Sequence, residues 1–250
     1  MAFSNSYVFG FAATVCLVCS LSLATAAKGL EDIQNANKKR DKQGSILNAL
    51  GISGDGATPL QGEAIDAAWE DNVQVVFVSP DGTPVEGIEY DLDEDGLLSE
   101  EDVAFAWKQV KGTDETPKLL SVYQRKDEAG GVIRFAIPVY GTGLWGPISG
   151  YIALDPAGDE ILAATFFAPK ETPGLGLEIT KPKFVEQWSG KRLRTPEGDT
   201  VSVVKDCTGK PAATCVDGVS GATITSVGVH DMVASAATFY APYLKRTAGS

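Results

Sequence analysis

The sequence of 250 residues contains a single histidine, His230, and no internal repeat. His230 falls in a segment whose apolar residues recur at helical spacing, where we expect the imidazole to pack or to face solvent. We therefore expect neither a histidine-based catalytic triad nor a metal site with histidine ligands.

Positive charge is also scarce. The chain has 21 Lys and Arg residues against 33 Asp and Glu residues, which gives a formal net charge of -12. Binding to nucleic acid by phosphate neutralisation needs clustered Lys and Arg, so nucleic acid is excluded as a partner. Anionic lipid would repel this chain, so any attachment to a membrane must come from the burial of apolar side chains.

No charged residue precedes Lys28, and Val8–Ala27 is rich in apolar residues. A helix of about 20 residues is about 30 Å long, which matches the hydrocarbon core of a bilayer. The segment is either a retained anchor or a signal peptide with a small-x-small cleavage site at 24–26. Because no basic residue precedes the apolar run, we favour an anchor over 1–27, followed by a soluble domain over 28–250.

The basic residues nearest to the apolar run all follow it: Lys28, Lys38, Lys39, Arg40 and Lys42. The positive-inside rule therefore predicts that the C-terminal domain lies in the cytoplasm. Two of the four cysteines, Cys207 and Cys215, lie eight positions apart in a loop-like stretch. They form a disulfide if the domain lies outside the cytoplasm, or stay two free thiols; the sequence favours neither.

Hydrophobic periodicity predicts five strands and three helices. The strands are expected at Val73–Val78, Val132–Val139, Ile148–Leu154, Ile161–Ala168 and Val201–Lys205. The helices are expected at Gly29–Leu50, Pro182–Trp188 and Thr225–Leu244. Several strands follow one another without a helix between each pair. This order predicts an α+β fold, with a mainly antiparallel or mixed twisted sheet and packed helices.

Three stretches hold the candidate site residues. Asp217–Ser226 is an Asp-Gly turn followed by small residues that open the last helix, where free backbone N–H groups favour a phosphate. From the residues alone, capping of that helix by Thr225 or Ser226 is the favoured interpretation. The stretches Glu171–Gly176 and Gly141–Pro147 are glycine-containing turns that either contact a planar ligand or simply join two elements. Trp145 is expected to pack in the core more often than on a ligand.

Together with Asp41–Leu47, Pro138–Trp145 and Trp188, these stretches resemble the C subunit of the bacterial sodium-translocating NADH:quinone oxidoreductase, which has an FMN-binding domain. The pattern Asp-x-x-Ser-Gly-Ala-Thr at 217–223 is the flavinylation signature of that family. The resemblance implies that FMN is attached to Thr223 through a phosphoester, installed by a separate Mg-dependent flavin transferase that recognises Asp217. It replaces the capping interpretation at this stretch.

The resemblance further implies that this chain has no catalytic residues of its own and relays electrons from NADH toward quinone. Other membrane and flavoprotein subunits would complete the complex and move Na+. The domain would be periplasmic, held to the inner membrane by one helix, which conflicts with the basic residues after the anchor. The implied FMN contacts, besides Thr223, are Asp217, Ser220, Gly221, Ala222, Thr225, Glu171, Thr172, Gly174, Leu175, Gly176, Leu144 and Trp145.

One segment departs from that family. Residues 91–102 match an EF-hand loop, with Asp91, Asp93 and Asp95 at positions one, three and five and Asp102 at position twelve. Asp102 stands where glutamate is usual, and its shorter side chain is expected to weaken the binding of Ca2+ and to favour Mg2+ relative to Ca2+. An acidic solvated insertion explains the segment equally well.

Two other functions fit parts of the sequence. The related flavin subunit of an Rnf-type ferredoxin:NAD oxidoreductase shares the Ser/Thr-Gly-Ala-Thr motif, but the first fifty residues and the Gly-Leu-Trp stretch favour the sodium pump. A secreted calcium-binding module would combine a cleaved leader with the acidic segment 91–102. Retention of the N-terminal helix and a yellow colour in the mature protein would exclude that module.

Overall fold

The computed structural model describes residues 4–53, 60–85, 120–195, 198 and 200–248. The chain divides into two compact units, Met1–Lys42 and Gln43–Ser250. Helix α1 (Asn5–Ala49) runs through the first unit, and its last turns belong to the second. By length and composition α1 could cross a membrane, although a signal sequence near the N-terminus passes the same test. The apolar run and the predicted helix Gly29–Leu50 are thus one continuous helix.

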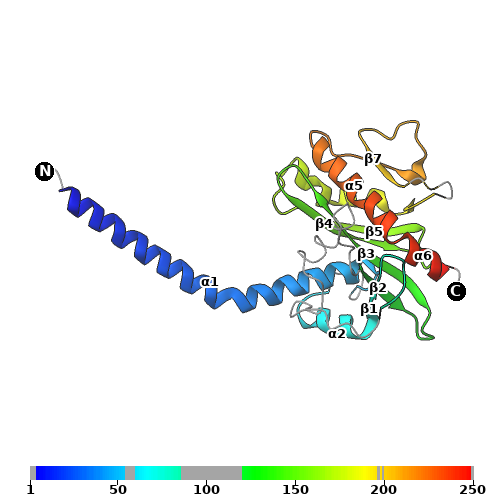
Figure 1. The fold of residues 1–250 in the computed structure, drawn as a ribbon, viewed down its shortest axis with the longest axis horizontal. Helices are drawn as coiled ribbons and strands as arrows, with labels where there is room; N and C mark the ends of the chain where they lie inside the picture. The colour runs from blue at the N-terminus through cyan, green and yellow to red at the C-terminus, as the bar shows by residue number, and fades with distance from the viewer. Residues whose placement is uncertain (1–3, 54–59, 86–119, 196–197, 199, 249–250) are drawn as a thin grey trace. The chain divides into compact units, whose positions relative to one another are not determined.

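A six-stranded antiparallel sheet, in which the strands follow chain order, forms the centre of the second unit (Figure 1). Its strands are β1 (Val73–Val78), β2 (Leu120–Lys126), β3 (Val132–Thr142), β4 (Pro147–Leu154), β5 (Glu160–Phe167) and β6 (Lys191–Arg192). A separate parallel pair consists of β7 (Ser202–Val204) and β8 (Cys215–Asp217). The predicted α+β class with an antiparallel sheet is confirmed.

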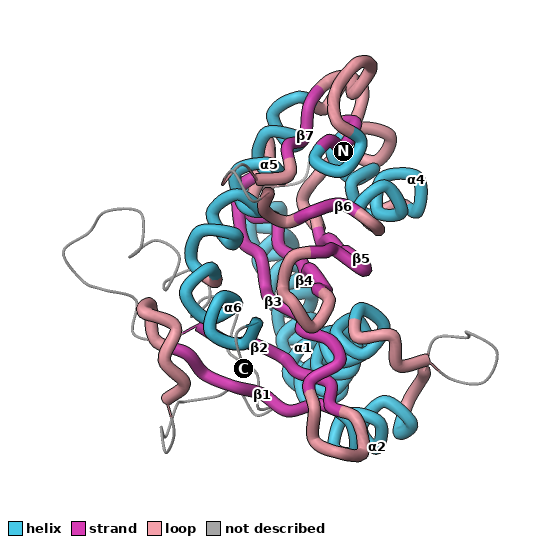
Figure 2. Tube along the Cα trace, turned by 90° about the vertical axis from the view of Figure 1, so that its right-hand side faces the viewer, coloured by secondary structure: helices cyan, strands magenta, loops and turns pink. Residues whose placement is uncertain are grey.

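Helices cover both faces of the sheet. Figure 2 shows α5 (Thr223–Phe239) and α6 (Ala241–Ala248) on one side and α2 (Glu63–Asn72) on the other. Alternate residues of β3 point to opposite faces, as a pleated strand requires. Phe135 and Ile137 lie in the main core with α5, whereas Ala136 packs with Ile46 and Leu50 near the end of α1.

Short helical segments complete the second unit. They are η2 (Gly176–Thr180), α4 (Pro182–Val185), η3 (Glu186–Trp188) and η4 (Ala212–Thr214). The predicted helix Pro182–Trp188 is therefore α4 followed by one 3-10 turn, with Pro182 at its first position. Trp188, at its end, is fully buried in the main core.

Two predicted elements are arranged differently in the structure. The predicted helix Thr225–Leu244 is interrupted at Tyr240, since Pro242 has no N–H to donate and its ring obstructs the preceding turn. The predicted strand Val201–Lys205 is present as β7, but it pairs with β8 and lies outside the main sheet. The apolar residues that recur at helical spacing along this segment are buried: Val229, Met232, Val233, Ala236, Ala237 and Tyr240.

Alkaline pH is expected to destabilise the fold through Tyr240. Its hydroxyl donates to the carbonyl oxygen of Ser121 at 3.0 Å, and burial raises its pKa well above 10. In the unfolded chain the phenol ionises near pH 10, so above that pH the unfolded state binds fewer protons. The free energy of unfolding should therefore fall as pH rises above about 10. Urea unfolding at pH 8 to 11 should show a shallower fall for Tyr240→Phe, and equal slopes would contradict the assignment.

Candidate functional site

The three glycine-containing stretches meet on one side of the second unit. The turn between β3 and β4 is closed by the Gly143 N–H, which donates to the carbonyl of Gly146 at 2.8 Å. The second stretch follows β5, and the third opens α5. Glu171, the first residue of the stretch after β5, links this stretch to the other two. Its carboxylate accepts from the backbone N–H of Trp145 and from the Thr225 hydroxyl, both at 2.8 Å.

Thr223 is the first residue of α5, and its side chain is exposed. No side chain caps this helix. The Thr225 hydroxyl donates to Glu171 instead, and the Ser226 hydroxyl accepts from the N–H of Val219 at 3.0 Å. The interpretation that Thr225 or Ser226 caps the helix is therefore wrong. An uncapped N-terminus beside an exposed hydroxyl is a site where a phosphate is favoured by backbone N–H groups and by the helix dipole.

The residues before Thr223 form a tight turn. Gly221 has φ of 80°, which glycine adopts without steric penalty, and the Ala222 N–H donates to the Val219 carbonyl at 3.1 Å. A β-carbon at Gly221 would lie 3.1 Å from Cδ2 of Leu175. The stretch Glu171–Gly176 is thus in contact with the stretch Asp217–Ser226. Ser220 and Gly221 remain exposed.

The turn 172–175 uses some of its own backbone donors. The N–H of Leu175 donates to the Thr172 carbonyl at 3.1 Å, and that of Gly174 donates to Oε1 of Glu178 at 3.1 Å. The exposed side chain of Leu175 is therefore available for contact with a ligand, whereas its N–H group is already bonded. Thr172 and Gly174 are exposed as well, whereas Gly176 is buried against Glu171.

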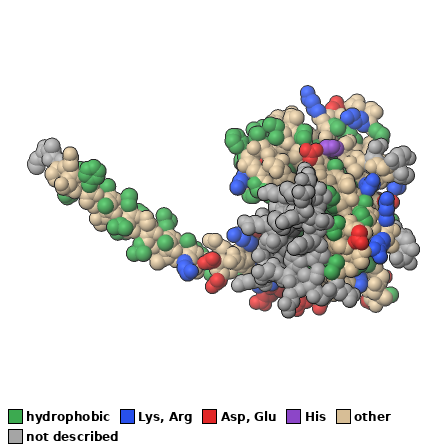
Figure 3. Space-filling view, in the orientation of Figure 1, with side chains coloured by type: hydrophobic (Ala, Val, Ile, Leu, Met, Phe, Trp, Pro, Cys, Tyr) green, Lys and Arg blue, Asp and Glu red, His purple; other side chains and the backbone are tan. Residues whose placement is uncertain are grey.

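Exposed apolar side chains lie on the three stretches and on the first turns of α5, and together they are called the apolar patch. Among the described residues of the second unit, the exposed large apolar side chains all belong to this patch: Leu144, Trp145, Leu175, Ile224 and Val227. Hydrophobic side chains gather at the upper left of the globular unit in Figure 3. Trp145 is 65% exposed, so the expectation that it packs in the core is wrong. Isolated apolar side chains are ordinary on a surface, whereas several gathered in one region are typical of a binding surface.

Two glycines allow α5 to approach the sheet closely enough to complete the site. A β-carbon at Gly228 would lie 2.2 Å from the carbonyl oxygen of Thr142, at the end of β3. A β-carbon at Gly141 would lie 2.8 Å from Cβ of Met232 and 3.1 Å from the Gly228 carbonyl oxygen. The start of α5 is therefore held against the turn that contains Leu144 and Trp145.

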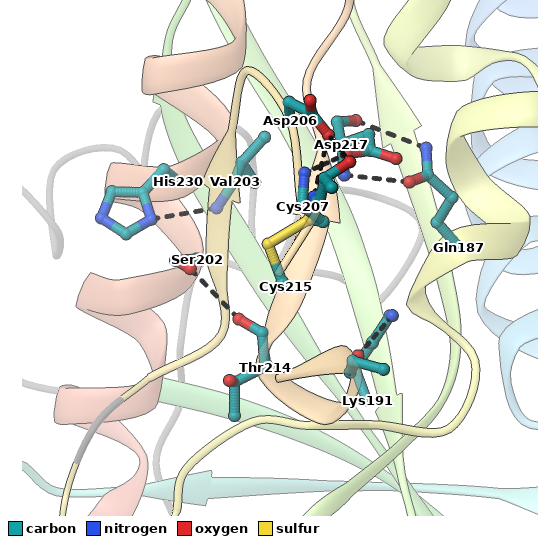
Figure 4. The surroundings of a disulfide bond; sticks show 12 residues. Gln187, Lys191, Ser202, Val203, Asp206, Cys207, Thr214, Cys215, Asp217 and His230 are labelled. Atoms are coloured by element: carbon teal, nitrogen blue, oxygen red, sulfur yellow. Dashed lines mark hydrogen bonds between the residues drawn. A yellow bond between two sulfur atoms is a disulfide. The ribbon is translucent and has the colours of Figure 1, made fainter. Parts of the chain in front are cut away.

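Asp217 is fixed by its neighbours although its side chain is exposed (Figure 4). Its Oδ1 accepts from the N–H of Cys207 at 2.7 Å, and Cys207 forms a disulfide with Cys215. The side chain of Gln187 accepts from the Asp217 N–H at 2.9 Å and donates to the Asp217 carbonyl at 3.3 Å. Of the two alternatives for Cys207 and Cys215, the structure has the disulfide.

His230 makes a structural contact. Its Nδ1 accepts from the backbone N–H of Val203 at 3.3 Å, which joins α5 to β7 (Figure 4). Within the described residues, no group of three or more His, Cys, Asp or Glu side chains could hold a metal ion. The acidic segment 91–102, with Asp91, Asp93, Asp95 and Asp102, lies outside the described residues, so its metal site stays a prediction.

Three site residues escaped the sequence analysis. Ile224 and Val227 interrupt the polar face of α5 at a spacing of three, and this pattern could have revealed an exposed apolar pair. Gln187 has no comparable signal, because its contact with Asp217 joins positions 30 residues apart.

Comparison with known proteins identifies a flavin-binding family over the part of the chain that contains the site. The model of the FMN-binding domain family matches residues 143–238. The C subunit of the Na(+)-translocating NADH-quinone reductase of Vibrio anguillarum is 34% identical, with 85% of this chain and 82% of the relative covered. The same subunit of Vibrio alginolyticus is 33% identical over the same shares. That of Neisseria meningitidis serogroup B is 30% identical, with 93% and 90% covered.

The fold is also similar to that of solved structures. The C subunit of the Na(+)-translocating NADH-quinone reductase of Parabacteroides distasonis gives a TM-score of 0.67 at 29% identity, over 86% of this chain and 96% of that chain. NqrC of Shewanella oneidensis gives a TM-score of 0.65 at 24% identity, over 86% and 100%, and shows likeness of fold.

Proposed function

Because the chain belongs to the family of the C subunits of Na(+)-translocating NADH-quinone reductases, we propose that it carries electrons within such a complex through FMN esterified to Thr223. Electrons would pass from NADH toward quinone, with the oxidation of NADH, the reduction of quinone and the movement of Na+ on partner subunits. The FMN, when bound, accepts and donates one or two electrons, while the protein positions and tunes it.

The observation that supports Thr223 most directly is the exposed hydroxyl at the first residue of an uncapped helix. A phosphate esterified to Thr223 Oγ1 lies where backbone N–H groups and the helix dipole favour negative charge. The two other hydroxyls in the first turn of α5 are less suitable, since Thr225 is 1% exposed and bonded to Glu171, and Ser226 is bonded to Val219.

The apolar patch fits the rest of the cofactor. An isoalloxazine ring is a flat, largely apolar surface, and the exposed side chains of Leu144, Trp145 and Leu175 offer it contact near Thr223. Ile224 and Val227 extend the same surface along α5. Attachment by a covalent bond prevents loss of the cofactor from such an open site.

Asp217 is suited to recognition by a Mg-dependent flavin transferase. Its carboxylate is exposed, and its position is fixed through Cys207 and Gln187. An exposed carboxylate of fixed geometry provides a specific contact for an enzyme that must place Thr223 in its own active site.

The disulfide supports a periplasmic location for the domain. Disulfides form and persist in oxidising compartments and are rare in the cytoplasm. The disulfide outweighs the basic residues after the apolar run, since the positive-inside rule is statistical and partner subunits influence topology. Helix α1 would then anchor the chain in the inner membrane by a single pass.

Removal of the disulfide should weaken both the fold and flavin attachment. Replacing Cys207 and Cys215 by serine opens a cross-link between positions eight apart, and should lower the free energy of unfolding by about 2 kcal/mol. Attachment should slow because the N–H that holds the Asp217 carboxylate is no longer fixed. Urea unfolding and the initial rate of labelling measure the two effects. Cys16→Ser with Cys19→Ser is the control, since both are free thiols in α1. Identical behaviour of the two double variants would refute this role.

Mass spectrometry tests the proposed function itself. The full chain is co-expressed with a Mg-dependent flavin transferase, purified in detergent, denatured and digested. We expect the peptide that contains Thr223 to be heavier by the mass of FMN less one water. An unmodified peptide, obtained while a control substrate of the same transferase becomes labelled, would overturn the proposal.

A further inference from the structure

Glu171 is a buried carboxylate that joins two distant parts of the site. It is 6% exposed, and each of its oxygens accepts a hydrogen bond. Oε1 accepts from the Trp145 N–H, 26 positions away, and Oε2 accepts from the Thr225 hydroxyl, 54 positions away. A buried carboxylate is unfavourable unless it is hydrogen-bonded, so this arrangement requires both partners.

The surrounding backbone leaves room for this carboxylate and for little else. A β-carbon at Gly143 would lie 2.5 Å from Oε1, and one at Gly176 would lie 1.9 Å from Oε2. Both distances are far shorter than a van der Waals contact, so a side chain at either position would displace the Glu171 carboxylate from its hydrogen bonds. Gly143 and Gly176 therefore leave the space in which the Glu171 carboxylate reaches Trp145 and Thr225.

We propose that Glu171 is a positioning residue that holds the turn 143–146 and the first turn of α5 in the relative geometry that flavin attachment and binding need. The inference rests on the proposed attachment of FMN to Thr223, which lies two residues before Thr225 in the same helical turn. Both carboxylate oxygens are engaged by the protein, so Glu171 acts on the flavin through Trp145 and Thr225 and not by touching it.

The hydrogen-bonding capacity of Trp145 and Thr225 determines which substitutions at Glu171 are informative. The Trp145 N–H can only donate, whereas the Thr225 hydroxyl can rotate to accept. Glutamine at 171 can therefore keep both hydrogen bonds, with its oxygen toward Trp145 and its amide toward Thr225, whereas alanine loses both. Glu171→Gln is thus the conservative rescue of Glu171→Ala, and exposed Glu186→Ala is the matched control.

Two readouts are measured on the full chain in detergent. The first is backbone amide exchange at Trp145 in the protein before flavin attachment, followed by mass spectrometry. The second is flavin attachment by the transferase, followed by the visible circular dichroism of the bound flavin, which depends on how rigidly the ring is held. A residue that only stabilised the fold would leave the dichroism of the attached, folded protein unchanged.

For Glu171→Ala we expect amide exchange at Trp145 to accelerate roughly tenfold or more, since its hydrogen bond is lost. We expect attachment to slow by roughly tenfold, as small displacements of reacting groups do, with a diminished dichroism band. Glu171→Gln should restore attachment to within about threefold of the wild type and recover the band. Glu186→Ala should match the wild type in every readout.

Glu171→Ala with wild-type attachment and wild-type dichroism would overturn the inference. If that variant does not fold, Thr225→Val decides, since it keeps the packing and removes one of the two bonds. Thr225→Val should shift both flavin readouts in the direction expected for Glu171→Ala, and wild-type behaviour would overturn the inference. A wild-type chain that takes up no flavin refutes the proposed function instead, and exchange at Trp145 then decides whether Glu171 organises the turn.

Discussion

Replacement of Thr223 by alanine is expected to leave the chain without covalently bound flavin. The exposed hydroxyl at the first residue of α5 is the acceptor in the proposed phosphoester, and alanine has no oxygen to esterify. The variant is co-expressed with a Mg-dependent flavin transferase, denatured in SDS and viewed on a gel under ultraviolet light. Its band should be as dark as that of the chain expressed without the transferase.

Thr223→Ser is the informative companion to this variant. Serine keeps the hydroxyl at the same position of the helix, so fluorescence should return. Thr238→Ala, at an exposed threonine further along α5, controls for a general effect of removing a threonine and should stay fluorescent. A fluorescent Thr223→Ala band would place the attachment elsewhere and remove the central element of the proposed function.

The main strands could be predicted because their sequence pattern is local. β1, β3, β4 and β5 are runs of β-branched and apolar residues bounded by turn-forming residues, and β1 has the predicted bounds Val73–Val78. β2 could not be predicted in this way, because the polar residues Ser121 and Gln124 interrupt its apolar pattern. Both are buried, and each contacts a tyrosine 119 positions later in the chain: the Gln124 side chain donates to the Tyr243 hydroxyl, and the Ser121 backbone carbonyl accepts from Tyr240.

The sequence motif of the site could be predicted, whereas the hydrogen bonds that its residues make could not. From residue type alone, Thr225 and Ser226 appeared to cap α5, and only the resemblance to a flavoprotein family pointed to Thr223. The hydroxyls of Thr225 and Ser226 are instead bonded to Glu171 and Val219. Such bonds depend on how the β3–β4 turn, the turn after β5 and α5 pack together, and no local pattern specifies that packing.

The same limit applies to the exposed side chains. Trp145 follows two glycines and a leucine, and tryptophan in such a bend usually packs inward. Here the short turn between β3 and β4 directs it outward, while Trp188 fills the core. The contrast between the two tryptophans follows from tertiary structure, since each lies close to a glycine in the sequence.

Gly228→Ala is expected to destabilise the fold strongly, because the added methyl group would meet backbone atoms of β3. The new β-carbon would lie 2.2 Å from the Thr142 carbonyl oxygen and 3.1 Å from its carbonyl carbon, and both are backbone atoms. Neither can rotate away, so α5 must move off the sheet. Overpacking of this kind costs about 3 kcal/mol, and the gain in helix propensity offsets about 1 kcal/mol of that. The free energy of unfolding should therefore fall by about 2 kcal/mol.

Gly44→Ala is the matched control for that variant. Gly44 also lies within a helix, but its added β-carbon would be 3.4 Å from Cδ1 of Ile65, an ordinary contact. Urea unfolding of the apoprotein in detergent, followed by tryptophan fluorescence, should show a lower midpoint for Gly228→Ala alone. Since the movement of α5 also displaces Thr223 from the apolar patch, Gly228→Ala should lose flavin attachment under conditions in which it remains folded. Equal stability of the two variants would show that the close approach of α5 to β3 is not required, and the role assigned to Gly228 would then be wrong.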